Sequence, residues 1–164
     1  MKPQTRYILG IDPDLEKSGI ALLDRQRGEF LKVSAVSFVE MNLILRGDAP
    51  DKDDITIVLE DSDLSTNWHV NPRDNVHVAA AKGRSIGMCH ATARHIKELA
   101  EYYQLPVVQM KPLRKCWKGP NKKITQAEAE QFMIGLPKRT NPEMRDAALL
   151  AWVVSGLPIR IPPK

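Results

Sequence analysis

The sequence predicts an α/β fold built on a mixed five-stranded sheet with flanking helices. After three strands the order becomes strand, helix, strand and helices, which is typical of this class. Between the fourth and fifth strands the spacing of apolar residues changes to that of a helix, over residues 75–103. The five strand-length apolar runs are residues 7–11, 19–23, 29–37, 55–59 and 106–110.

Length and composition predict one globular unit. The 164 residues suit a single domain, so we expect residues 1–164 to form one domain with a core at about 6–157 and a short tail at 158–164. The 43% hydrophobic and 27% charged residues exclude a mostly disordered chain or a fibre. The two cysteines show neither zinc-site nor disulfide-framework spacing. The first apolar run is too short for a signal peptide or a membrane span, so we expect a cytoplasmic protein with no membrane partner.

The first 60 residues predict an antiparallel meander followed by a further strand. Residues 7–11 are an apolar run that ends at Asp12, and polar turns separate the next two runs. Residues 37–46 fit a short helix or a continued strand, and the pattern does not choose between them. An acidic linker then leads to the β-branched run at 55–59, which ends at Glu60.

Helix signals dominate the second half. After a polar loop at 61–74, apolar residues recur at spacings of 3, 4, 3, 4 and 3, which predicts one stripe of a long helix. Residues 125–134 predict a helix with Thr125 as its N-cap and Glu128 completing a capping box. The last helix, 142–155, has an asparagine N-cap, a proline at its first position and a glycine after its end. The stripe consists of Ile86, Cys89, Ala93, Ile96, Ala100 and Tyr103.

The net charge of +4 conceals a strong asymmetry. Residues 1–82 carry a formal charge of −4 and residues 83–164 carry +8. Residues 102–127 contain no acid, whereas a solvated surface normally mixes both signs. We therefore expect the second half to bind a polyanion such as nucleic acid. The six bases of this tract are Lys111, Arg114, Lys115, Lys118, Lys122 and Lys123.

Four carboxylates stand where they can converge. Asp12 and Glu60 each follow an apolar strand directly, and Glu143 and Asp146 share a face at the start of the last helix. Because later turns of that helix are apolar, acids that face the sheet there need a cation to neutralise them. Oxygen ligands without His or Cys favour Mg²⁺, with Mn²⁺ able to substitute, and two such ions roughly 4 Å apart serve phosphodiester hydrolysis. We interpret the four acids as catalytic and metal-binding residues.

Five motifs, in this order, resemble the RuvC family of Holliday junction resolvases. The resemblance spans nearly the whole chain, residues 7–156, and residues 112–118 are most similar to the small enzymes of phages and prophages. The motifs are Ile8-Leu-Gly-Ile-Asp-Pro13 followed by Gly19, Ile57-Val-Leu-Glu60, Lys82-Gly-Arg-Ser-Ile-Gly87, residues 112–123, and Glu143-x-x-Asp146-Ala-Ala-Leu-Leu-Ala151.

The resemblance implies an RNase H-like fold, Mg²⁺ dependence, a homodimer, and paired nicks in four-way DNA junctions in a bacterial or phage-infected cell. The four acids match, in chain order, the acid of the first strand, the acid of the fourth strand and two acids of the last helix. Lys115 and one of Lys122 or Lys123 match the basic residues that approach the scissile phosphate. The long helix would lie at the dimer interface, where Gly83 and Gly87 permit close approach; the alternative is that these glycines let the helix pack on its own sheet.

Three features depart from the family pattern. Asp14 stands where a glycine usually follows Asp-Pro, which leaves the shape of that turn open. Glu143 replaces what is commonly Asp, and this longer side chain can still bind a metal. The aromatic residue that often follows the fourth-strand acid is missing from residues 61–64.

Two tryptophans and one further base complete the expected DNA-binding set. Trp68, beside Arg73 in the 61–74 loop, can stack on an unpaired base, or it can anchor the loop to the body. Trp117 lies among bases, where contact with DNA and half-buried packing are both open.

Three other functions compete with this interpretation. A protein with this fold that binds branched DNA without cleaving it is disfavoured by the presence of all four acids. An RNase H-like ribonuclease or RNA-processing relative would share the acids and select RNA by its 2′-hydroxyl. A nucleotide-binding module of the sugar-kinase and actin class would need a second lobe and a glycine-bearing phosphate turn, which this sequence lacks.

Overall fold

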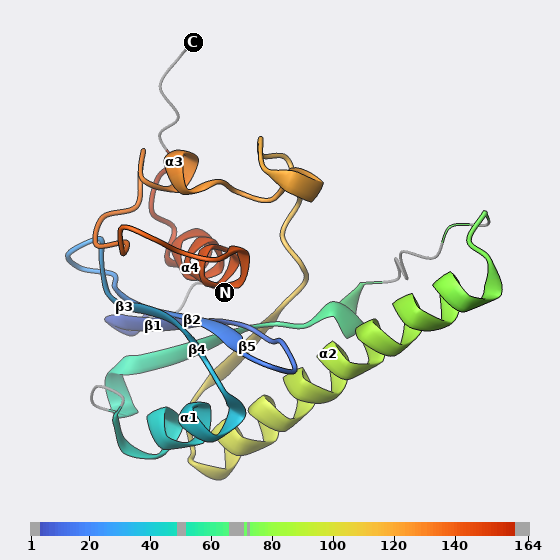
Figure 1. Cartoon of the computed structure of the whole chain (residues 1–164). Helices are drawn as coiled ribbons and strands as arrows, with labels where there is room; N and C mark the ends of the chain where they lie inside the picture. The colour runs from blue at the N-terminus through green and yellow to red at the C-terminus, as the bar shows by residue number, and fades with distance from the viewer. Residues whose placement is uncertain (1–3, 49–51, 66–70, 72, 160–164) are drawn as a thin grey trace.

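Five strands form one mixed sheet in the computed structural model, which describes residues 4–48, 52–65, 71 and 73–159. Strands β1, β2 and β3 form the expected antiparallel meander, and β4 and β5 continue the sheet parallel to β1. The strand order is β3-β2-β1-β4-β5 (Figure 1). The predicted mixed five-stranded sheet is therefore confirmed. Its strands are β1 (Tyr7–Asp12), β2 (Ser18–Asp24), β3 (Glu29–Val36), β4 (Ile55–Glu60) and β5 (Val107–Met110).

Helices cover both faces of this sheet, α4 on one side and α1 with α2 on the other (Figure 1). Ile8 and Val58 pack in a core with α4, and Leu9 and Ile57 pack in a second core with α1 and α2. Within the described part of the chain, no helix is both long and apolar enough to span a membrane. The helices are α1 (Phe38–Leu43), α2 (Val76–Tyr102), α3 (Gln126–Ala129) and α4 (Pro142–Ser155).

Two glycines let α4 lie directly on the sheet. A Cβ on Gly10 of β1 would come within 2.3 Å of the Ala147 carbonyl oxygen in α4. A Cβ on Gly19 of β2 would come within 2.0 Å of the Glu143 carbonyl oxygen, at the start of the same helix. Real Cβ atoms do not tolerate such approaches, so both positions exclude any side chain. The first turns of α4 are thereby placed against β1 and β2.

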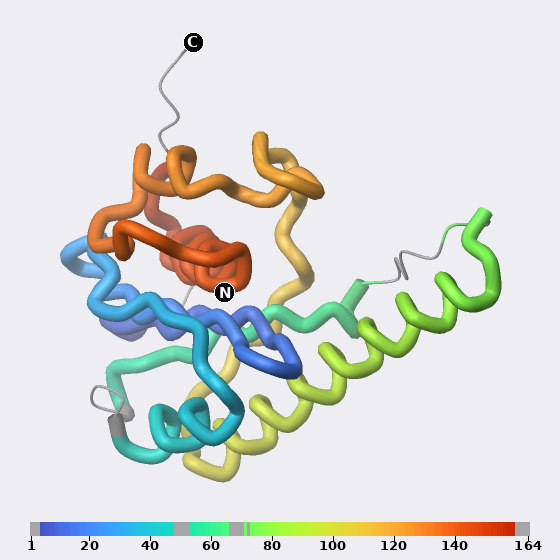
Figure 2. Tube along the Cα trace, viewed as in Figure 1, coloured from blue at the N-terminus to red at the C-terminus, as the bar shows by residue number. Residues whose placement is uncertain are grey.

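Helix α2 extends well beyond the sheet, and its first half runs free of the body in Figure 2. Its long span matches the prediction and Asn75 caps it, but only the C-terminal part of the apolar stripe is buried. Cys89, a member of that stripe, is half-buried. A Cβ added to Gly83 or Gly87 would have no neighbouring atom within 4 Å. The packing of α2 on its own sheet therefore does not require glycine at these positions.

One element settles an ambiguity in the sequence prediction, and another is shorter than predicted. The ambiguous residues 37–46 begin with helix α1, because Ser37 and Glu40 form a capping box there. Helix α3 is only one turn long, whereas a helix over 125–134 was expected. The predicted Thr125 cap is present, but the chain turns after Ala129 and Ile134 pairs with the edge of β3.

Candidate active site

The alternation of side chains along β1 and β4 places Asp12 and Glu60 on the face that α4 covers. Asp12 lies two residues after Gly10, which contacts α4, and Glu60 lies two residues after Val58, which packs in the α4 core. The two strands are parallel neighbours, so they end at the same edge of the sheet. The two carboxylates therefore emerge side by side, as the sequence predicts.

The other two acids stand on the first turns of α4. Asn141 caps the helix, its Oδ1 accepting a hydrogen bond from the Met144 backbone N–H at 2.8 Å, and Pro142 occupies the first position. The close approach at Gly19 holds the Glu143 backbone against β2. Glu143 and Asp146 then project near the ends of β1 and β4.

Charge interactions show that the acids share one electrostatic environment. Burial raises the pKa of Asp12 well above its ordinary value, and the negative charges of Glu60, Asp146 and Glu143 raise it further. Burial and the charge of Asp146 also raise the pKa of Glu60. Lys123 opposes the rise at both residues. The cluster therefore holds more negative charge than its surroundings neutralise.

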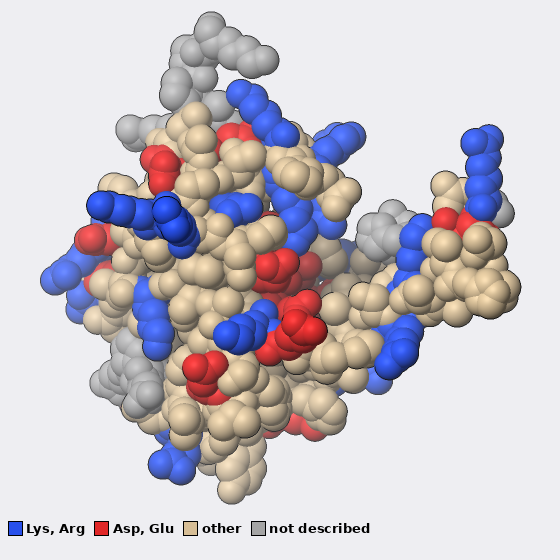
Figure 3. All heavy atoms as spheres, in the orientation of Figure 1, with Lys and Arg blue, Asp and Glu red and all other residues tan. Residues whose placement is uncertain are grey.

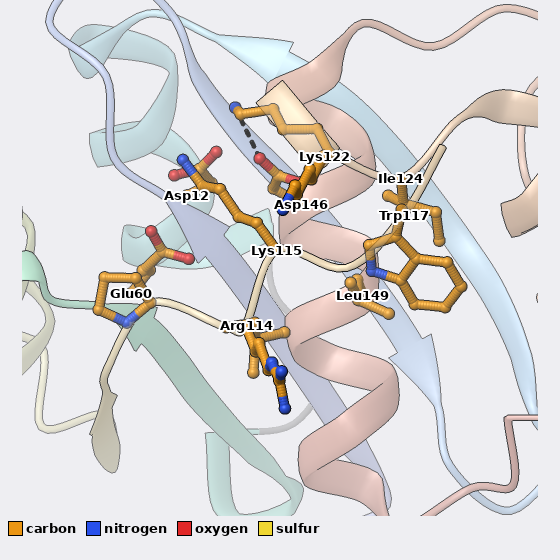
Figure 4. Close-up of a pocket in the computed structure, with 12 residues that line it drawn as sticks. Asp12, Glu60, Arg114, Lys115, Trp117, Lys122, Ile124, Asp146 and Leu149 are labelled. Atoms are coloured by element: carbon orange, nitrogen blue, oxygen red, sulfur yellow. Dashed lines mark ion pairs between the residues drawn. The ribbon is translucent and has the colours of Figure 1, made fainter. Parts of the chain in front are cut away.

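Two lysines reach into the acid cluster from the basic tract. Lys123 Nζ lies 2.7 Å from Asp146 Oδ2 and 4.0 Å from Glu143 Oε1. Although burial lowers the pKa of Lys123, the hydrogen bond to Asp146 and the surrounding negative charges outweigh it and raise that pKa. The positive charge of Lys115 also opposes the rise in the pKa of Glu60. In Figure 4 Asp12, Glu60 and Asp146 face one hollow, and the dashed line marks the lysine–carboxylate pair.

The basic tract is a folded loop rather than an open arm. The Trp117 backbone N–H donates to the Lys122 carbonyl at 3.1 Å, and the Gly119 N–H donates to the Lys123 carbonyl at 3.0 Å. Glu128, from the capping box of α3, accepts a hydrogen bond from the Lys118 backbone N–H at 3.1 Å. These contacts hold the lysines close to α4.

Two connected hollows open at the acids. The smaller, of about 70 Å³, is lined by Asp12, Glu60 and Asp146 together with bases of the tract. The larger, of about 450 Å³, continues from Asp12 and Glu60 along α2. In the space-filling view, acidic and basic side chains lie next to each other where the body meets the protruding helix (Figure 3). The smaller hollow thus brings carboxylate oxygens and positive charge together, and the larger one adds Lys115 to Asp12 and Glu60.

The donor set suits a divalent cation. All four acids supply oxygen, which Mg²⁺ and Mn²⁺ prefer, and burial together with neighbouring negative charge raises the pKa of Asp12 and of Glu60, so a bound cation would stabilise their ionised forms. Among the described residues, no three His, Cys, Asp or Glu side chains are yet arranged to hold a metal together. Asp146 instead pairs with Lys123. The residues fit such a cation chemically, and binding it requires the side chains to rearrange.

Comparison with solved structures identifies the fold. No family model matches the sequence, and no curated protein matches it. The structure is similar to T. thermophilus RuvC in complex with a Holliday junction substrate, with a TM-score of 0.52 and 12% identity over 91% of this chain and 90% of that one. The fold is RNase H-like. The yeast mitochondrial Holliday junction resolvase Ydc2 aligns with a TM-score of 0.43 and 11% identity, over 94% of this chain and 81% of that one.

Within this RNase H-like fold, the predicted DNA-binding residues occupy different places. Arg114, Lys115, Lys122 and Lys123 line the smaller hollow, as does Trp117. Trp117 is half-buried and stacks on Phe132, with ring centroids 6.0 Å apart. The side chains of Lys111 and Lys118 are exposed but outside both hollows, as is Arg73, which precedes the far end of α2. Trp68 lies outside the described residues.

The residue Asp14, which departs from the family pattern, shapes the turn after β1. Its Oδ1 accepts a hydrogen bond from the Glu16 backbone N–H at 2.9 Å, and its own N–H donates to Ser18 Oγ at 3.1 Å. The carboxylate therefore closes the β1–β2 turn, a role that a glycine in this position would not have.

Sequence reasoning missed Arg145, whose side chain joins the basic loop to the segment before α4. Its Nε donates to the Ile124 carbonyl at 2.8 Å, and its Nη1 donates to the Thr140 carbonyl at 2.6 Å. Arg145 thus ties the residue after Lys123 to the start of α4. Its place between Glu143 and Asp146 is the only sequence signal, and alone it does not reveal this contact.

A second missed group fixes α2 beside the acids. Asp63, in a short 3-10 turn after β4, lies 2.6 Å from His90 Nδ1 and 2.6 Å from an Arg94 Nη2. These contacts join the segment after Glu60 to the middle of α2. His90 also lines the larger hollow.

Proposed function

We propose that this protein is a metal-dependent DNA endonuclease that resolves four-way junctions. The observation that carries the proposal is the convergence of acids from β1, β4 and α4 at one sheet edge, beside a folded basic loop. The similarity of the fold to a junction-bound RuvC supports it.

The acids are proposed to hold Mg²⁺, with Mn²⁺ able to substitute. Two bound ions would activate a water and stabilise the leaving oxygen in phosphodiester hydrolysis. The ligand oxygens come from Asp12, Glu60, Glu143 and Asp146. Because Asp12 is largely buried, water screens its attraction to a cation less than it would at the surface. Lys115 and Lys123 lie where they can bind the scissile phosphate and orient it toward the acids.

The remaining bases are proposed to hold the DNA backbone without regard to sequence. Arg114 and Lys122 line the hollow, and Lys111 and Lys118 extend the positive surface along the same loop. Arg73, at the far end of α2, would contact an arm of the junction away from the cleavage site. Trp117 supports the loop by packing on Phe132, and it lines the smaller hollow, where it is proposed to contact the DNA. Trp68 is proposed as the residue that stacks on an unpaired base.

The active form is proposed to be a homodimer. No residue between Val76 and Ala91 of α2 is buried, although a helix this long and exposed needs a partner surface. Gly83 and Gly87 leave this face open to close approach by a second helix. Two sites related by a twofold axis would place paired nicks symmetrically across the junction.

The test is incubation of purified protein with a labelled four-way junction, a linear duplex of matched sequence and an RNA–DNA hybrid, each with Mg²⁺ or EDTA. We expect symmetric nicks in the junction with Mg²⁺ and none with EDTA. Cleavage of the hybrid instead would indicate a ribonuclease. Tight junction binding without cleavage in Mg²⁺ or Mn²⁺ would indicate a binding protein that has lost catalysis.

A further inference from the structure

We propose that Lys123 is a built-in competitor of the divalent cation: its ammonium group holds Asp146 in the metal-free protein and must leave when a cation binds. The inference rests on the proposed function and adds a second role for Lys123. The same side chain that later contacts the phosphate first neutralises the acids. The cation and the lysine therefore bind Asp146 in alternation.

The position of Lys123 is determined by the fold around it. Its carbonyl accepts the Gly119 N–H, and a Cβ on Gly119 would lie 2.5 Å from that carbonyl oxygen, so only glycine permits the contact. Its N–H donates to the Pro120 carbonyl at 3.1 Å. On the next residue, Ile124, the carbonyl is held by Arg145. The backbone of Lys123 is thus clamped on both sides, and the side chain is aimed at α4.

The ammonium group occupies the place that a cation needs. It lies 2.7 Å from Asp146 Oδ2 and within 4.0 Å of Glu143 Oε1, and both side chains are only partly exposed. A divalent ion bound to the same carboxylate would lie within a few ångströms of the ammonium. Like charges at that separation repel strongly in a partly buried site. One carboxylate cannot keep both partners.

The remaining acids explain why the exchange favours the cation when it is present. Asp12 and Glu60 have no lysine as close as the one that pairs with Asp146 among the ion pairs of the described residues. A divalent ion would bring two positive charges and could bind several carboxylates directly, whereas Lys123 brings one charge and its ion pairs within the described residues are with Asp146 and Glu143. Release of Asp146 would also correct the present arrangement, in which no three acids are placed to hold a metal together.

The released side chain has an evident destination. Lys123 lines the smaller hollow together with Lys115, and Asp12, Glu60 and Asp146 line the same hollow. A phosphate that enters between them would meet the ammonium as it leaves Asp146. Cation binding and phosphate binding by Lys123 would then favour each other, because both require the same ion pair to open.

The test measures cation binding without DNA. Mg²⁺ alone is titrated calorimetrically into the wild-type protein, Lys123→Met, Lys123→Arg and Lys138→Met. Lys138 is exposed and outside both hollows, so its substitution removes one positive charge without touching Asp146. We expect Lys123→Met to bind Mg²⁺ about fivefold or more tightly than the wild type, the lower end of typical coupling between sites. Lys123→Arg and Lys138→Met should bind within about twofold of the wild type, below that range.

Each alternative result is distinguishable. Equal or weaker Mg²⁺ binding by Lys123→Met, with an unchanged circular dichroism spectrum, would overturn this inference and leave the endonuclease proposal standing. An equal gain in Lys138→Met would also overturn it, because the effect would then come from net charge alone. Absence of Mg²⁺ binding in every protein would overturn both proposals.

Discussion

Lys123 Nζ lies 2.7 Å from Asp146 Oδ2, and this contact joins the basic loop to the last helix across the acid cluster. The acids proposed to hold metal and the lysines proposed to hold phosphate are therefore parts of one network. Arg145 strengthens it by binding the backbone on both sides of the pair. A substitution among the acids is therefore expected to alter the contacts of the lysines, and a substitution among the lysines to alter those of the acids.

Asp12→Asn should stabilise the metal-free protein at neutral pH. Burial and neighbouring acids raise the pKa of Asp12 in the folded state. As pH rises above about 4, this carboxyl therefore ionises in the unfolded chain before it ionises in the folded protein, and the free energy of unfolding falls. The asparagine variant escapes this cost. Thermal unfolding in EDTA should give a higher melting temperature for the variant at pH 7.5 and equal temperatures near pH 3.5. A variant less stable than the wild type at pH 7.5 would refute the crowding of the acids.

Substitution of Lys122 and Lys123 by alanine should weaken junction binding and reduce its dependence on salt. Each lost phosphate contact reduces the steepness of log affinity against log salt by about 0.9, so the double variant should reduce it by about 0.9 if Lys123 stays paired with Asp146 in EDTA and by about 1.8 if DNA opens that pair. Binding is measured by fluorescence anisotropy in EDTA at several salt concentrations. Lys138→Met serves as the matched control and should keep the wild-type slope. If the double variant also keeps that slope, these lysines do not contact phosphate.

Gly19→Ala should destabilise the fold and displace the start of α4. The new methyl group would meet the Glu143 carbonyl oxygen, a backbone atom that cannot move alone, and overpacking of this kind costs about 2 kcal/mol. Gly47→Ala is the control, because open space also surrounds Gly47 and it lies outside the proposed dimer face, so alanine there should change stability by less than about 0.5 kcal/mol. Urea denaturation of both variants measures the difference. Equal stabilities would show that α4 does not approach β2 so closely.

Asp24→Asn should lower stability at neutral pH, away from the active site. The buried carboxylate accepts hydrogen bonds from Arg6 Nη2 at 2.8 Å and from the Gln26 backbone N–H at 3.0 Å. The hydrogen bond from Arg6 lowers the pKa of Asp24, so its contribution is complete above about pH 5 and is lost as pH falls through the folded-state pKa. We expect a loss of about 2 kcal/mol at pH 7. Urea unfolding at pH 7 and pH 3 should show the gap between variant and wild type closing in acid; a constant gap would contradict this.

Local patterns were enough to predict most of the fold. The strand that ends at Asp12 and the helix that begins after Asn141 both carry their own signals, an apolar run in one case and a capped start in the other. Period-two alternation then implies that Asp12 shares a face with Gly10. The positions of the acids follow from these elements, so the candidate site could be assembled from the sequence.

Contacts between distant segments could not be predicted in this way. Helix α3 ends after one turn because Ile134 pairs with β3, a partner about a hundred residues away in the chain. Arg145 reaches a carbonyl, and every residue offers a carbonyl, so no sequence pattern marks its target. The half-burial of Cys89 depends on how far α2 extends past the sheet, which periodicity does not reveal.

The central claim, that the acid cluster cleaves branched DNA, is tested most directly by Asp146→Asn in the junction assay. Cleavage and binding are measured together on one labelled four-way junction with Mg²⁺. We expect the variant to bind the junction at least as tightly as the wild type, because the basic loop remains and Lys123 loses its charged partner, and to cleave it about a hundredfold or more slowly, because a ligand charge is lost. Cleavage by Asp146→Asn at the wild-type rate would contradict the assignment of these carboxylates as the catalytic centre.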